Sequence, residues 1–131
     1  MAQQPLELIL IRHLAESISL PMMVVDAEND LLFFNEAAGR VLGRSFDDAA
    51  ALSLDQRVQV FDFRDERGQP VPIEALPLVV ATREQRPAHA ALRLRGFDGV
   101  TRPIEATAFP LATAGGHHVG AVVMFWETRA P

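Results

Sequence analysis

The sequence predicts an α+β domain: a five-stranded antiparallel sheet, short helices on one face of it, and an amphipathic helix at the N-terminus. Two observations lead to this fold class. Five short apolar runs of strand character form an opening pair and a closing group of three, each joined by residues that favour turns. Helical patterns occupy the segment between the two groups. Antiparallel strand groups with helices segregated between them are typical of one sheet covered by a helical layer.

Composition restricts the classes of function. The chain has 131 residues, of which 49% are hydrophobic and 22% charged, as expected for a single folded domain. Its net charge of −5 gives no positive field for nucleic acid. Cysteine is absent, which excludes disulfides, thiolate chemistry and cysteine-bound metals. No apolar run approaches the roughly 18 residues of a membrane span, and the start lacks a basic signal-peptide region, so we expect a cytoplasmic protein.

The first element is an amphipathic helix over residues 6–18. Its main apolar stripe has helical spacing and contains Leu6, Ile9, Leu10, Leu14 and Ile18. Leu8 and Ile11 lie outside this stripe and form a second one. A terminal helix usually keeps one face in water, so the second stripe predicts a partner helix in a dimer. The alternative, in which both stripes pack within one chain, stays open.

A hairpin and a capped helix follow. Pro21 ends the first helix, and the apolar runs 22–25 and 31–34 flank the turn formers 26–30. Asn35 suits a helix N-cap, because its side-chain oxygen can accept a backbone N–H of the first turn. The predicted helix covers 36–42 and stops at Gly43.

The middle of the chain is less regular. Ser45 and Asp48 have capping-box spacing for a short helix that would run to Leu52. Residues 55–72 receive no assignment, because their apolar positions fit either a short strand or helical turns. Pro77 suits the first turn of a helix over 78–84.

Three period-two runs close the chain, over 88–95, 101–110 and 118–126, and turns at 96–99 and 112–116 join them. Alternation assigns one face of these strands to the core. The residues predicted to point inward are Leu92, Leu94, Ile104, Ala106, Ala108, Val119, Ala121, Val123 and Phe125.

Small residues on the inward face suggest a ligand pocket. Alanines at 90, 106, 108 and 121 remove side-chain volume, which either opens a cavity or lets helices pack closer, and both readings stay open. The predicted pocket residues are Asn35, Leu92, Ile104, Ala106, Ala108, Ala121 and Val123. Asn35, Thr107 and Arg93 are the candidate polar anchors.

No residue pattern indicates catalysis. The acidic pairs Asp47-Asp48 and Asp62/Asp65 are expected to be solvated, and no phosphate-binding glycine motif occurs. His117 and His118 are adjacent in a strand and therefore point to opposite faces, which is poor geometry for one metal ion. We expect neither an enzyme nor a metal site.

Several segments recur in a recognisable order along the chain: 25–35, Ala37-Ala38, 41–43, 65–70, 76–78, Asp98-Gly99, Pro110-Leu111 and 120–123. Together they resemble the PAS domains, small sensor and dimerisation modules of bacterial signalling proteins such as two-component systems. The resemblance spans nearly the whole chain.

The resemblance implies a non-catalytic signalling function. PAS domains commonly hold a small ligand between the sheet and the helices, and a leading amphipathic helix commonly packs on the outer face of the sheet and on its twin. A homodimer follows as the expected state. Its predicted interface comprises Leu8, Ile11, Val122, Met124 and Trp126.

The family couples its last strand to an output domain through an Asp-Ile-Thr-like motif. Trp126-Glu127-Thr128 stands at the corresponding place, with Glu127 and Thr128 similar to the motif. These residues are the predicted signal-coupling site. The output would come from a domain continuing the chain or from a partner protein.

The resemblance also bears on cofactors. Haem-carrying relatives place an axial histidine on or near the helix that here spans 78–84; this helix has no histidine, although His89 is close by. The absence of cysteine excludes the photocycle in which a cysteine adds to flavin. We therefore expect no cofactor.

We divide the chain into a helical extension (1–20), the PAS domain (21–128) and a short tail (129–131). Two other functions stay open besides a ligand sensor. One is a constitutive interaction module with a filled core, and the other is a haem- or flavin-binding redox or gas sensor.

Overall fold

A computed structural model describes residues 6–46 and 52–128 of the chain. The elements in chain order are α1 (Leu6–Ser17), β1 (Met22–Asp26), β2 (Leu31–Phe34), α2 (Glu36–Leu42), α4 (Leu54–Phe61), the 3₁₀ turn η1 (Ile73–Ala75), α5 (Pro77–Arg83), β3 (Ala88–Arg95), β4 (Thr101–Ala112) and β5 (His118–Glu127). All paired strands are antiparallel, and they form one sheet in the order β2-β1-β5-β4-β3. The predicted α+β class and five-stranded sheet are confirmed.

The opening hairpin and its capped helix form as predicted. Asp26 holds the turn, because its Oδ1 accepts backbone N–H groups of Glu28 and Asp30. The side chain of Asn35 caps α2 by accepting the Ala38 N–H at 2.9 Å. Gly43 ends α2 in the left-handed conformation, where its N–H donates to the Gly39 carbonyl.

The unassigned segment 55–72 begins with a helix. Ser53 caps α4 through a complete capping box with Gln56, which explains why the apolar residues that follow adopt helical turns. Pro77 starts α5 as predicted. Asp48 of the predicted capping box, and residues 47–51 of its predicted helix, lie outside the described residues.

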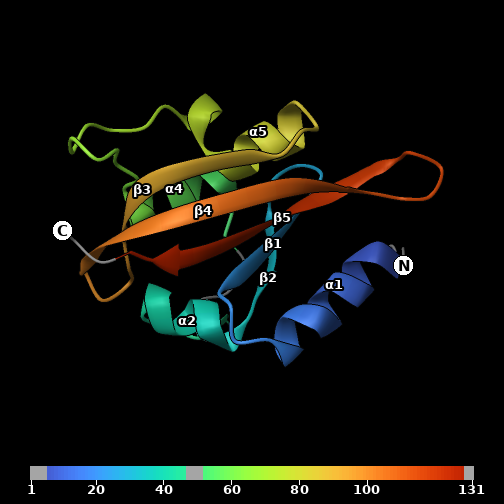
Figure 1. Ribbon diagram of the computed structural model, residues 1–131, viewed down its shortest axis with the longest axis horizontal. Coiled ribbons are helices and arrows are strands. Elements are labelled where there is room, and N and C mark those ends of the chain that lie inside the picture. The colour runs from blue at the N-terminus through green and yellow to red at the C-terminus, as the bar shows by residue number, and fades with distance from the viewer. Residues whose placement is uncertain (1–5, 47–51, 129–131) are drawn as a thin grey trace.

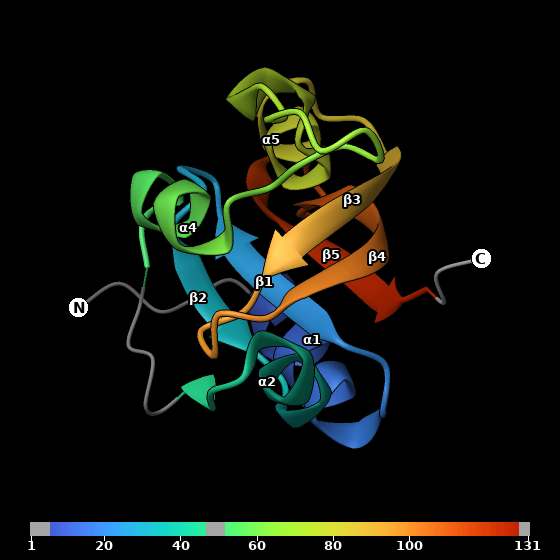
Figure 2. The same cartoon turned by 90° about the vertical axis from the view of Figure 1, so that its left-hand side faces the viewer.

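The main core lies between the sheet and the short helices α2, α4 and α5. Strand alternation points Met23, Val25, Leu92, Ile104 and Phe125 into it. Leu42, Phe61 and Val79 close it from the helices. Figure 2 shows α2 and α4 in front of β1 and β2, with α1 behind them.

A second core lies on the outer face of the sheet beneath α1. Leu8 and Ala15 pack there with Met22, Val24 and Val122. Figure 1 shows α1 and α5 on opposite sides of the sheet. The sequence analysis predicted that Leu8 and Ile11 face a partner helix. This prediction was wrong, because both residues pack against the sheet of their own chain. Leu8 is 5% exposed and Ile11 is half-buried against the same core, whereas Leu6, Ile9, Leu10 and Leu14 are exposed.

One inward assignment was also wrong. Val119 packs with the outer core. The β4–β5 register shifts between Leu111 and Ala112, so the strict alternation that places Ala121, Val123 and Phe125 inward does not extend to the first residues of β5.

Gly120 permits the closest approach between β1 and β5. It pairs with Asp26, and a Cβ at this position would lie 2.1 Å from the Val25 carbonyl oxygen. That separation is far below van der Waals contact, and both groups belong to strand backbones that cannot swing aside. The central strand pair therefore depends on glycine here.

We expect Gly120→Ala to lower the free energy of unfolding by about 2–3 kcal/mol, because the added methyl group forces β1 and β5 apart. Urea unfolding measures this. Gly115→Ala is the matched control, since its methyl group would meet no atom closer than 3.6 Å, and it should change stability by less than about 0.5 kcal/mol. Equal effects of the two substitutions would contradict the proposed role of Gly120.

Candidate functional site

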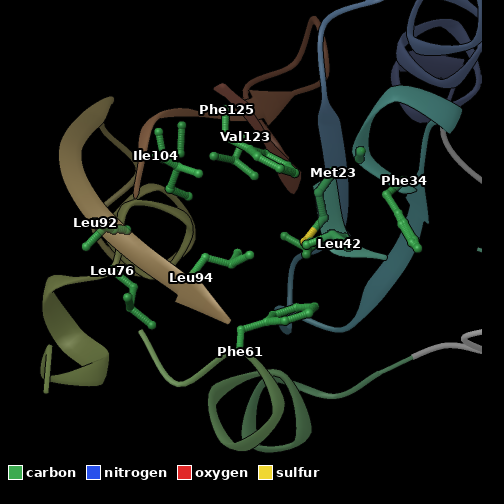
Figure 3. Packing of buried hydrophobic residues seen from close by; sticks show 14 of the residues in the cluster. Met23, Phe34, Leu42, Phe61, Leu76, Leu92, Leu94, Ile104, Val123 and Phe125 are labelled. Atoms are coloured by element: carbon green, nitrogen blue, oxygen red, sulfur yellow. The ribbon is translucent and has the colours of Figure 1, made fainter. Parts of the chain in front are cut away.

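A cavity of about 60 Å³ lies between the sheet and the helices α4 and α5. Its wall is almost entirely apolar and combines side chains from β1, β3, β4 and β5 with others from α4, α5 and the segment between them. Figure 3 shows Leu76, Leu92, Leu94 and Ile104 on one side of this interior and Phe61 and Met23 on another. The space is larger than one water molecule needs, and its apolar wall offers water few partners. Its chemistry therefore suits a small apolar molecule.

The structure places four of the predicted pocket residues in the cavity wall: Leu92, Ile104, Ala106 and Val123. Ala108 and Ala121 are fully buried but lie outside that wall, in the main core. At these two positions the small side chains allow close packing, whereas Ala106 borders free space. Both readings of the alanines thus apply, at different positions.

Asn35 does not line the cavity and cannot act as its polar anchor. Its Oδ1 accepts the N–H groups of Met22 and Ala38, at 3.0 and 2.9 Å. Its Nδ2 donates to the carbonyls of Ala15 and Leu20, at 2.9 and 2.8 Å. Each polar atom of this side chain is thus used inside the chain, and it ties α1, β1 and α2 together.

The other two candidate anchors also lie outside the cavity wall. Thr107 contacts His89 on the neighbouring strand through its hydroxyl group, and His89 lies 3.3 Å from Glu105. Arg93 is exposed, and its guanidinium donates to the Glu66 carbonyl. Alternation turns both residues away from the inward-facing neighbours Ala106, Ala108, Leu92 and Leu94.

The one charged side chain in the cavity wall among the described residues is Arg57 of α4, which the sequence did not single out. It is 3% exposed. Its Nη1 donates to the carbonyls of Asn29 and Leu52, at 2.7 and 3.0 Å, and its Nη2 donates to the Asn29 side-chain oxygen. Burial lowers the pKa of Arg57 to about 10, against the opposing charges of Asp30 and Asp26, so the side chain stays cationic at neutral pH.

Asn29 connects this arginine to α5. It adopts the left-handed conformation, with φ of 67°, which asparagine tolerates better than most residues. Its side-chain amide donates to Thr82 Oγ1 at 2.7 Å, and that hydroxyl lies within hydrogen-bonding distance of the Leu78 and Val79 carbonyls. A buried polar network of Arg57, Asn29 and Thr82 therefore joins α4, the β1–β2 turn and α5.

Sequence reasoning missed the α4 side of the cavity. Leu54, Arg57, Phe61 and Phe63 line it, and all lie in or beside the segment that received no assignment. The available signal was the Ser53 to Gln56 spacing of a capping box directly before an apolar run. The same signal would have placed Arg57 and Phe61 four residues apart on one helix face.

The residues predicted for the dimer interface have different environments. Val122 and Leu8 are buried within the chain, while Met124 and Ile11 are half-buried. Trp126 is 37% exposed and its ring lies 6.1 Å from that of His89. Most of the exposed apolar surface on this side belongs to α1, where Leu10 and Leu14 are 57% and 52% exposed.

The predicted signal-coupling residues end the sheet. Trp126 and Glu127 are the last residues of β5, and the Thr128 N–H donates to the Pro103 carbonyl at 2.9 Å. Glu127 lies 3.6 Å from Arg102, which also pairs with Asp98 at 2.8 Å. These contacts fasten the C-terminal end of β5 to the start of β4.

Within residues 6–46 and 52–128, no group of three or more histidine, aspartate or glutamate side chains is arranged to hold a metal ion. In the same residues, no helix combines the length and apolar character that a membrane span requires.

Comparison with known proteins identifies relatives. A family model described as a PAS domain matches residues 9–77. Searches of curated proteins give no significant match.

Solved structures share the architecture. The PAS domain of BvgS from Bordetella pertussis is 17% identical and superposes with a TM-score of 0.63 over 94% of this chain and 86% of the other. The PAS domain of nitrogen regulation protein NR(II) from Vibrio parahaemolyticus is 14% identical, with a TM-score of 0.64 over 91% and 98%. A light-oxygen-voltage domain studied with a flavin analogue is 12% identical, with a TM-score of 0.66 over 92% and 85%. At sequence identities this low, the similarity to these structures shows a shared fold and nothing about function.

We expect Asn29→Ala to cost about 2–3 kcal/mol of stability, because it removes the buried acceptor of the Arg57 Nη2 and the amide that donates to Thr82 Oγ1, and because alanine is strained in the left-handed conformation. Asn29→Gly removes the same side chain but suits the left-handed backbone, so it should cost roughly 1 kcal/mol less. Urea unfolding of the unaltered protein and the two variants separates the loss of the side-chain hydrogen bonds from the backbone strain that alanine adds. A change below 0.5 kcal/mol for Asn29→Ala would show that the network does not hold α4 and α5 together.

Proposed function

The chain belongs to the PAS domain family, and from this membership we propose that it is a non-catalytic sensory module whose ligand binds in the cavity between the sheet and the helices α4 and α5. The observation that carries the proposal is the cavity itself. Protein interiors are normally close-packed, and an apolar space of about 60 Å³ costs stability unless something fills it. The ligand is small and mainly apolar.

The cavity wall also bears on the cofactor alternative. No histidine belongs to the part of the wall that the structure describes, so a haem there would find no imidazole nitrogen as axial ligand. The constitutive interaction module with a filled core is the second candidate function. It predicts that no ligand binds between the sheet and the helices and that the side chains there tolerate no added volume, which is the other outcome of the test below.

Signal output requires that ligand binding change a surface of the protein. We propose that the chain acts as a homodimer in the cytoplasm of a bacterial cell and that α1 and the end of β5 carry the signal. The exposed stripe Leu6, Ile9, Leu10 and Leu14 lies on the side of the sheet that also carries Trp126, which supports a second copy as the partner. A ligand shifts such a dimer only by binding its two arrangements with different affinity.

Filling the cavity should remove ligand binding without unfolding the protein. We expect Ala106→Leu to change stability by less than about 1 kcal/mol, because its larger side chain enters free space. Ala108→Leu is the matched control on the same face of β4, because Ala108 is fully buried outside the wall of this cavity, and it should cost about 1–3 kcal/mol.

Native mass spectrometry of the purified protein is the accompanying measurement. We expect a reproducible additional mass on the unmodified chain and its loss in Ala106→Leu. A clean mass for both proteins, together with strong destabilisation by Ala106→Leu, would favour the filled interaction module.

The dimer proposal is tested on exposed residues that the fold does not need. We expect the double substitution Leu10→Gln and Leu14→Gln to reduce the mass in light scattering from twice the chain mass of 14.4 kDa to that of one chain. Val100→Gln is the control, because Val100 is 49% exposed in the turn between β3 and β4 and should leave the dimer intact. A dimer that survives the double substitution would exclude this helix face as the interface.

A further inference from the structure

Arg57 brings a positive charge to the wall of an otherwise apolar cavity. It is 3% exposed, and its neighbours in the wall include Leu54, Phe61 and Leu92. Placing a cation among apolar side chains is unfavourable unless the charge is compensated. The partners that the chain itself supplies to the Arg57 guanidinium therefore determine which kind of ligand this site can bind.

The partners of this guanidinium are all neutral. They are two backbone carbonyls and the side-chain oxygen of Asn29. Across residues 6–46 and 52–128, no carboxylate lies within ion-pair distance of Arg57. Asp30 and Asp26 act on its charge only from farther away. The positive charge is thus hydrogen-bonded without being neutralised in place.

The pattern of hydrogen bonds leaves one edge of the guanidinium unused. An arginine has five N–H donors. The three bonds engage both donors of Nη1 and one donor of Nη2. The Nε–H and one N–H of Nη2 form no hydrogen bond with a described residue. Because the two oxygens of Asn29 contact Nη1 and Nη2, they occupy the edge between these two nitrogens, and the edge between Nε and Nη2 stays open. Two parallel N–H groups are the geometry with which arginine binds a carboxylate.

That edge is also not completely sealed off. Some buried side-chain nitrogen and oxygen atoms have neither contact with solvent nor a hydrogen-bond partner. Among the described residues, these atoms are the two ring nitrogens of His118. The Nε of Arg57 has no hydrogen-bond partner among the described residues and is not among them, so this atom is not completely sealed off by the protein. A purely structural role, in which Arg57 only connects α4 to the β1–β2 turn, would explain the three hydrogen bonds but not the open edge.

We propose that the ligand of this cavity is a small monocarboxylate with an apolar tail. Its carboxylate binds the Nε and Nη2 donors of Arg57, and its tail lies between Phe61, Leu92 and Ile104. This assignment rests on the proposed function, because it names the ligand class of the same cavity. It also gives the buried cation the counter-charge that the chain does not provide.

Matched ligands on the unaltered protein test the proposal. Butanoate, hexanoate and octanoate and the corresponding amides differ only in the charged head, and calorimetric titration at pH 7 compares their affinities. We expect at least one carboxylate to bind tenfold or more tightly than its amide, which corresponds to about 1.4 kcal/mol. Ala106→Leu should weaken both members of that pair, since it fills the space for the tail.

The outcomes separate the two proposals. An amide that binds as tightly as its carboxylate would overturn the carboxylate assignment and leave the apolar ligand site standing. Carboxylate binding that Ala106→Leu does not weaken would overturn the assignment as well, because it would lie on the protein surface. Absence of binding by both series, with a clean native mass, would overturn the assignment and the ligand sensor together.

Arginine variants supply a further comparison. Arg57→Gln keeps a hydrogen-bond donor and removes the charge, so it should abolish the preference for carboxylate over amide while the amide still binds. Arg93→Gln, on the exposed side of β3, is the control and should keep the preference. If Arg57→Gln does not fold, the ligand comparison on the unaltered protein decides alone. A preference that persists in a folded Arg57→Gln protein would overturn the role of Arg57.

Discussion

The central strands β1 and β5 are apolar on both faces, and the rest of the fold follows from this constraint. Met23 and Val123 point into the main core, while their neighbours Met22 and Val122 point into the outer one. A sheet with two apolar faces must be covered on both sides. On the outer side, the helix α1 covers the apolar part of β1 and β5 around Met22, Val24 and Val122. Among the described residues, the helices on the inner side are α2, α4 and α5, and the cavity lies between the last two and the sheet.

Local patterns predicted most of the fold, because the signals were local. The hairpin, the Asn35 cap, the Pro77 start of α5 and the three closing strands each follow from a few neighbouring residues. Periodicity in α1 revealed two apolar stripes but not which one meets the sheet, since both have helical spacing. That choice depends on the shape of the outer core, where Leu8 and Ala15 fit against Val24 and Val122.

The candidate site was only partly predictable for a related reason. Alternation gave the strand side of the cavity, including Ile104 and Ala106. It could not tell that Ala106 borders free space while Ala108 is packed, because this difference arises from where α4 and α5 lie. Arg57 escaped notice because a surface arginine and a buried one look alike in sequence. What distinguishes it is the left-handed turn at Asn29, whose carbonyl and side chain both face the guanidinium.

Because β1 and β5 pack against a core on each face, a ligand in the cavity would also act on α1. Met23 and Val123 line the cavity, and the adjacent residues of the same strands, Met22 and Val122, contact the core beneath α1. One layer of backbone therefore separates the ligand from the helix. Because close-packed side chains on such a layer move together, a ligand that prefers one position of β1 and β5 also prefers one position of α1. In the proposed dimer, that preference would reach the partner through the exposed face of the same helix.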